Sequence, residues 1–167
     1  EEGLGVTTVR AATAGAPAVI GAARRAHLLR ALAGTEAFPE LLTLYKRADH
    51  LAEHAPDDAA PDPTRFDAPE AGPLYEALPD ARAGVEALLA ATREQLPPWQ
   101  LGRGPSGTPQ PGDALRRVLA LKDPLDRFLD DVLVMVDDAK VRNNRLALLR
   151  ETRDVLAPLG ALEELGG

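Results

Sequence analysis

The segment His50-Leu51-Ala52-Glu53-His54 has the residue types and spacing of the His-x-x-Glu-His motif found in one class of zinc proteases. Two histidines four positions apart on a helix lie on one face, where they can share a metal ion. A catalytic zinc site also needs a third protein ligand, and no partner motif follows downstream. Lys46 and Arg47 add two positive charges beside the histidines, which disfavours a divalent cation. We therefore expect no metal site here.

Lys46, Arg47 and His50 form a second group with possible chemistry, which we call the basic ridge. At 100° per residue, all three project away from the apolar stripe of the helix expected over residues 35–55. That stripe consists of Phe38, Leu41, Leu42, Tyr45, Ala48 and Ala52. Such a ridge can contact phosphates, and its Arg and His can also contact bases. The sequence leaves one alternative open, a solvated helix face with charge pairs inside the helix.

Arg145 is unusual because it projects into the apolar stripe of the helix expected over residues 139–156. Members of that stripe are Val141, Leu148, Leu149, Val155 and Leu156. An unpaired charge there is costly, so we expect Arg145 to be paired and structural rather than in contact with a ligand. The nearby acids are Asp130, Asp131, Asp137 and Asp138. Asn144, at the edge of the stripe, is expected to cap or bridge, whereas Arg142 and Arg150 lie further around the helix and can reach a partner.

The net charge of −7 argues at first against a nucleic-acid ligand, because phosphate binding needs Lys and Arg. The acidity is local, however. Of 26 acids and 19 basic residues, ten acids and three arginines lie within 53–94, which leaves sixteen of each elsewhere. Residues 10–34 contain Arg24 and Arg25 among four arginines and no acid. Basic segments therefore exist that can attract a polyanion, although mixed charge on helix surfaces is equally ordinary.

Composition excludes several other classes of protein. With no cysteine, the chain has no disulfide, thiolate metal site or cysteine nucleophile, and a cytoplasmic location is expected. No apolar run approaches the roughly 20 residues that span a bilayer, so no membrane role is expected. The chain begins with Glu1-Glu2 rather than an initiator methionine, and we expect it to be a fragment of a longer protein.

Alanine and leucine dominate and no period-two pattern appears, so the expected fold is all-α, a single-domain bundle of about six to seven helices over residues 1–167. The expected helices are 17–34, 35–55, 67–78, 80–96, 113–121, 124–136 and 139–156, and residues 4–15 are a candidate for a further short one. Proline-rich loops are expected at 56–66 and 97–112. Asp67 with Glu70, and Asp123 with Pro124, have the spacing of helix starts.

Three segments in this order resemble the C-terminal domain of the bacterial glycyl-tRNA synthetase beta subunit. The first is Tyr45-Lys46-Arg47-Ala48-Asp49-His50, and the second is Pro69-Glu70-Ala71-Gly72-Pro73-Leu74-Tyr75-Glu76-Ala77-Leu78. The third, residues 123–149, is the most specific and runs from Asp123-Pro124-Leu125-Asp126-Arg127-Phe128 to Arg142-Asn143-Asn144-Arg145-Leu146. Their order and approximate spacing agree with the family over about residues 5–157.

The resemblance implies an anticodon-binding helical bundle of the type also found in arginyl-tRNA synthetase. It implies tRNA for glycine as ligand, and a parent enzyme that joins glycine to that tRNA with ATP and magnesium together with an alpha subunit. This chain alone is not expected to be catalytic, to hold a cofactor or to bind DNA. The expected tRNA contacts are Lys46, Arg47, His50, Arg142, Arg24, Arg25 and Arg150. The alternative is a helical subunit-docking or oligomerisation module without RNA contact.

Overall fold

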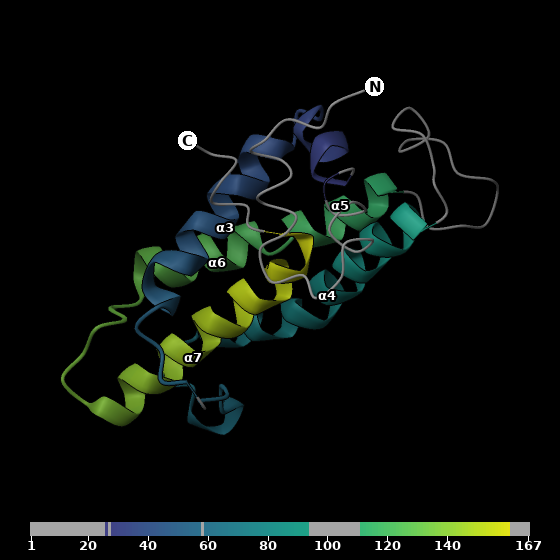
Figure 1. Cartoon of the computed structure of the whole chain (residues 1–167). Helices are drawn as coiled ribbons and strands as arrows, with labels where there is room; N and C mark the ends of the chain where they lie inside the picture. Colours follow the sequence, from purple (N-terminus) through teal and green to yellow (C-terminus); the bar gives the residue numbers. More distant parts are fainter. Residues whose placement is uncertain (1–25, 27, 58, 94–110, 161–167) are drawn as a thin grey trace.

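The computed structural model describes residues 26, 28–57, 59–93 and 111–160, and this part of the chain is helical with no strand (Figure 1). Residues 28–33 form a helical segment. The labelled α-helices are α3 (Phe38–Ala52), α4 (Ala71–Arg93), α5 (Pro111–Leu119), α6 (Lys122–Asp131) and α7 (Ala139–Leu156). Two short 3₁₀ helices, η1 (Pro63–Arg65) and η3 (Ala157–Leu159), complete them. The expected all-α class is confirmed for the described residues.

Helix α7 occupies the middle of the bundle, between α3 and α4 (Figure 1). It runs antiparallel to α3, and α4 packs on α7 and also on α5. The predicted range 139–156 for α7 is confirmed. The helix predicted over 4–15, most of the one over 17–34, and residues 97–110 of the loop predicted over 97–112 lie outside the described residues. The last two residues of that loop, Pro111 and Gly112, instead begin α5. The total number of helices and the arginyl-type architecture therefore stay predictions.

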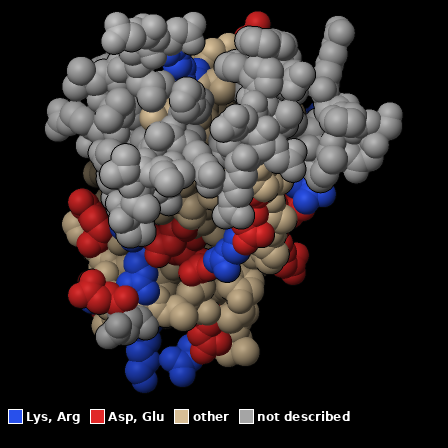
Figure 2. All heavy atoms as spheres, turned by 45° about the vertical axis from the view of Figure 1, so that its right-hand side comes forward, with Lys and Arg blue, Asp and Glu red and all other residues tan. Residues whose placement is uncertain are grey.

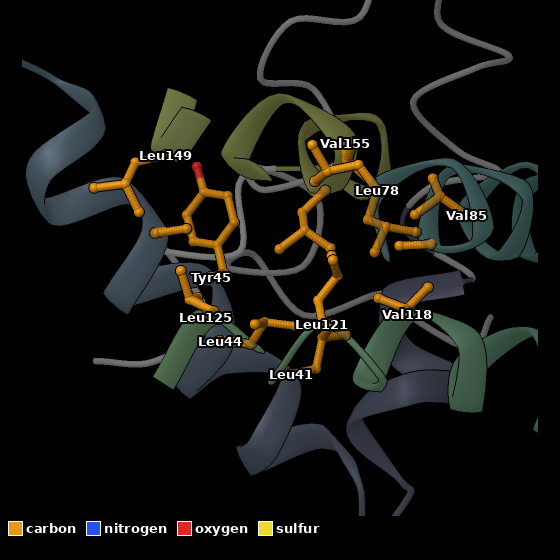
Figure 3. Close-up of a cluster of buried hydrophobic side chains, with 14 of the residues drawn as sticks. Leu41, Leu44, Tyr45, Leu78, Val85, Val118, Leu121, Leu125, Leu149 and Val155 are labelled. Carbon is orange, nitrogen blue, oxygen red and sulfur yellow. The ribbon is translucent and has the colours of Figure 1, made fainter. Parts of the chain in front are cut away.

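The core is a single cluster of leucines, valines and alanines, to which α3 to α7 all contribute (Figure 3). Phe128 of α6 and Leu121, between α5 and α6, are fully buried, and Tyr45 of α3 lies among the labelled core side chains. Burial of this apolar surface is the main favourable term for such a bundle, at about 25 cal/mol per Å². None of the described helices is long and apolar enough to cross a membrane.

Helix α4 corrects the prediction of two helices over 67–78 and 80–96. One helix runs from Ala71 to Arg93, with Pro79 inside it. Proline removes one backbone hydrogen bond, but the buried positions continue across it at helical spacing. These positions are Leu74, Leu78, Ala81, Val85 and Leu88. The continuous apolar face thus outweighs the local effect of the proline.

The connection after α6 corrects the prediction of a helix over 124–136. Helix α6 begins at Lys122, so Asp123 lies in its first turn rather than at its cap, and the helix ends at Asp131. Val132 then has extended φ and ψ of −111° and 118°. From Val132 to Met135 the side chains alternate between buried and exposed, as in a strand. Three valines at alternate positions favour this extended backbone over a helix.

Candidate functional site

Helix α3 presents the basic ridge, because its apolar positions hold the opposite face in the core. Leu41, Leu44 and Tyr45 are buried at helical spacing, together with Ala48 and Ala52. On the outer side, Lys46 and His50 are exposed, whereas Arg47 is only partly so. The predicted ridge therefore separates into two exposed residues and one that turns toward the neighbouring helix.

Arg47 is held by two carboxylates of α6. Its guanidinium donates hydrogen bonds to Asp126 and Asp130, and the distance from Nη2 to Asp130 Oδ1 is 2.7 Å. Asp126 also accepts a hydrogen bond from Lys122 Nζ at 2.9 Å. The hydrogen bond to Asp130, with the charge of both aspartates, raises the pKa of Arg47 despite partial desolvation. This contact joins α3 to α6, a structural use of Arg47 that helical projection alone did not predict.

Asn144 and Arg145 of α7 hold the loop between α3 and α4. The Asn144 side chain accepts from the backbone N–H of Asp62 at 2.7 Å and donates to its carbonyl at 3.1 Å. Arg145 Nη2 lies 2.7 Å from Asp67 Oδ2. Arg145 Nη1 also donates to the carbonyl of Leu133 at 2.6 Å. Arg145 is thus paired, but with Asp67, which lies far away in sequence, instead of the four aspartates nearby.

Asp67 therefore does not form the predicted capping box with Glu70, and α4 begins only at Ala71. Arg142 and Arg150, predicted to reach a partner, also donate to loop carbonyls. Arg142 Nη1 lies 2.8 Å from the carbonyl oxygen of Val136. Arg150 donates to the carbonyls of Pro56 and Ala59. With Asn144 and Arg145, these residues form a polar row on α7 that holds both neighbouring loops.

The first turn of α7 is capped by Asp138. Its carboxylate accepts from the backbone N–H of Lys140 at 2.8 Å and of Val141 at 3.2 Å. The bond from Val141, followed by that from Lys140, lowers the pKa of Asp138. This cap fixes the residue at which α7 begins, and it therefore helps to orient the side chains of the polar row.

The described surface offers no broad field of positive charge on the face drawn in Figure 2. Basic and acidic side chains are intermingled there, with uncharged surface between them. Arg24 and Arg25, also predicted as contacts, lie outside the described residues. His50 and His54 are exposed, and among the residues that the structure describes, which leave out His27 and Asp58, no group of three or more histidines and acids is arranged to hold a metal ion.

A hollow of about 610 Å³ lies between the start of α4 and α6. Its lining residues are Pro69, Glu70, Pro73, Asp123, Pro124, Arg127 and Asp131. Three carboxylates face one guanidinium, so the hollow disfavours phosphate. Sequence reasoning missed it because its two walls are about 50 residues apart, and the motifs on both walls were interpreted as helix starts rather than as two sides of one hollow.

No family model matches the chain, but comparison with curated proteins finds relatives that are similar to most of it. It is 34% identical over 165 residues to the glycine–tRNA ligase beta subunit of Desulforudis audaxviator, covering 98% of this chain and 21% of that protein. The beta subunits of Moorella thermoacetica and Desulforamulus reducens are 34% and 30% identical over 82% and 90% of this chain. These matches cover 17% and 19% of those two proteins. The chain thus spans about a fifth of the length of its curated relatives, and over most of its own length it is homologous to them.

Proposed function

We propose that this chain is the C-terminal, anticodon-binding part of a glycine–tRNA ligase beta subunit. The observation that carries this proposal is the homology over nearly the whole chain to proteins of that name. The all-helical bundle is compatible with the anticodon-binding role that the family resemblance implies. On this proposal the chain binds tRNA for glycine in the cytoplasm, while an alpha subunit, ATP and magnesium belong to the parent enzyme and not to this bundle.

The exposed part of the basic ridge is the best candidate for RNA contact. Lys46 and His50 are exposed on α3, and the helix that carries them is fixed by its buried face. An ammonium group can neutralise a phosphate, and an imidazole can hydrogen bond to a base of an unpaired loop. Arg47, Arg142 and Arg150 are weaker candidates than the sequence implied, because their side chains are only partly exposed.

Binding of the 167-residue chain to a transcript of glycine tRNA tests the proposal. We expect saturable binding that weakens when the anticodon bases are replaced, with a negative slope of log affinity against log salt concentration. Lys46→Ala with His50→Ala should weaken binding several-fold and make that slope shallower by about 1. Arg65→Ala is a matched control, because Arg65 is also exposed but lies on η1.

The rival, a docking module without RNA contact, predicts a different result from the same assay. It predicts equal and weak binding of glycine tRNA and of the anticodon variant, with no effect of the Lys46 and His50 substitutions. That result would remove the anticodon-binding proposal while leaving the homology intact.

A further inference from the structure

The connection between α6 and α7 carries the two exposed large hydrophobic side chains among the described residues. Leu133 is 72% exposed and Met135 is 52% exposed. They stand two positions apart, on either side of the buried Val134, and the Val136 N–H closes a tight turn at Met135 by donating to the carbonyl of Val134 at 3.1 Å. Figure 1 shows this connection swinging away from the bundle before it returns to α7. We call residues 132–136 the apolar tip.

The apolar tip is held in its shape by the bundle. Val132 and Val134, which alternate with the exposed pair, are only 7% and 4% exposed and anchor the segment in the core. Arg145 donates to the carbonyl of Leu133, and Arg142 donates to that of Val136. The backbone is thus fixed on both sides of Met135, and little conformational entropy remains to be lost when a partner covers the tip.

Charge around the tip favours a protein partner over RNA. Residues 130–138 contain four aspartates and no basic residue. Asp130 is paired with Arg47 and Asp138 caps α7, whereas Asp131 and Asp137 are exposed beside the tip. Lys140 and Arg142 follow in α7, but Arg142 is engaged with the carbonyls of the connection. A phosphate backbone would be repelled at this place, and so would a second copy of the same acidic loop. The complementary surface is an apolar depression with Lys or Arg at its rim.

The small apolar area of the tip indicates that the complementary surface belongs to the same polypeptide. Two side chains offer a few hundred Å² at most, whereas a stable complex between separate proteins buries about 800 Å² per partner. Such a small patch is sufficient when both surfaces are in one polypeptide, because the effective concentration is then in the millimolar range. In the relative from Desulforudis audaxviator, the matched region is 21% of the protein, so most of that polypeptide lies outside it.

We propose that the apolar tip docks, through Leu133 and Met135, into a basic-rimmed apolar depression on another domain of the same beta subunit. This inference rests on the proposed function, in that it takes the parent polypeptide to be a beta subunit. Docking would fix the orientation of the bundle relative to the remainder of the subunit. Docking would also account for the exposed Leu133 and Met135, which have no role in the basic ridge or in the polar row.

Oxidation of Met135 by hydrogen peroxide is a direct probe, because it is the single methionine of the chain. The oxidation rate is measured by peptide mass in the isolated 167-residue chain and in the complete beta subunit that contains it. We expect Met135 to be oxidised several-fold more slowly in the complete subunit. Leu133→Ser in that subunit should return the rate to that of the isolated chain, whereas Ala60→Ser, also at an exposed loop position, should not.

Equal rates in the isolated chain and the complete subunit would overturn the proposal. Protection that appears only when glycine tRNA is added would overturn it too, because the tip would then be an RNA contact. Protection that grows with the concentration of the isolated chain would assign the tip to self-association instead. Since the main comparison, between the isolated chain and the complete subunit, is made without tRNA, the docking proposal and the anticodon-binding proposal can fail separately.

Discussion

Helices α3 and α7 both present basic side chains, but the structure uses them differently. On α3, Lys46 and His50 are exposed, and one arginine contacts the aspartates of α6. On α7, every arginine makes a hydrogen bond or ion pair within the described structure; these residues are Arg142, Arg145, Arg150 and Arg153. Arginine suits this second use because its planar fork can reach two acceptors at once.

A basic residue near a loop can thus serve the backbone carbonyls of that loop instead of a ligand. The connections 53–70 and 132–138 contain little regular structure, and their backbone groups need partners. Asn144 and Arg145 supply several of these from one helix. Loss of a residue from the polar row should therefore affect stability before it affects binding.

Replacement of Arg145 should have the largest effect on stability. Arg145→Ala removes the contacts with Asp67 and Leu133 from a side chain that is only 14% exposed. Because the partner Asp67 is partly exposed, we expect the free energy of unfolding to fall by about 2–4 kcal/mol, near or below the range for breaking a buried ion pair. Urea unfolding measures the loss. A change below about 0.5 kcal/mol would show that the pair contributes little.

Loss of the contact between α3 and α6 should lower stability less than loss of Arg145. The same variant tests whether Arg47 serves only this contact or can also bind RNA. Asp126→Asn with Asp130→Asn leaves the side chains similar in size but removes both charges that hold the guanidinium. We expect a loss of about 1 kcal/mol, as for partly exposed ion pairs. If Arg47 can contact RNA when released, affinity for glycine tRNA should rise. Unchanged affinity would restrict the RNA-binding part of the ridge to Lys46 and His50.

The cap of α7 should produce a modest dependence of stability on pH. The pKa of Asp138 is lowered in the folded chain, so its contribution is present above the unfolded pKa and is lost as pH falls through the folded value. Asp138→Asn keeps a hydrogen-bond acceptor and should reduce the acid sensitivity of thermal unfolding. If Tm of that variant falls with pH below about 5 as it does in the unsubstituted chain, Asp138 is not a source of the acid sensitivity.

Apolar spacing predicted most of the fold. It located α7 and its buried leucines, and it identified the core side of α3, because helical periodicity reports burial directly. It failed at Pro79, where a local breaker was outweighed by a continuous core face. It also failed after Asp131, where Val132, Met135 and Val136 continue the apolar helix face although the three alternate valines suit a strand. Tertiary packing decided both cases.

The candidate site was less predictable than the fold. The sequence indicated that Arg145 needs a partner, but the partner, Asp67, is 78 positions away. The carbonyls that engage Arg142 and Arg150 belong to the backbone and carry no residue signature. A single sequence contains the donors of such contacts, whereas their acceptors become visible only when the loops are folded.

The most direct test of this division between the two helices compares Lys46→Ala with Arg142→Ala in paired measurements of unfolding and of glycine tRNA binding. We expect Lys46→Ala to change stability by less than about 0.5 kcal/mol, as at surface positions, while it weakens tRNA binding. Arg142→Ala should lower stability by about 1 kcal/mol and leave the affinity of the folded protein unchanged. The opposite pattern, with binding lost in Arg142→Ala and retained in Lys46→Ala, would contradict the account.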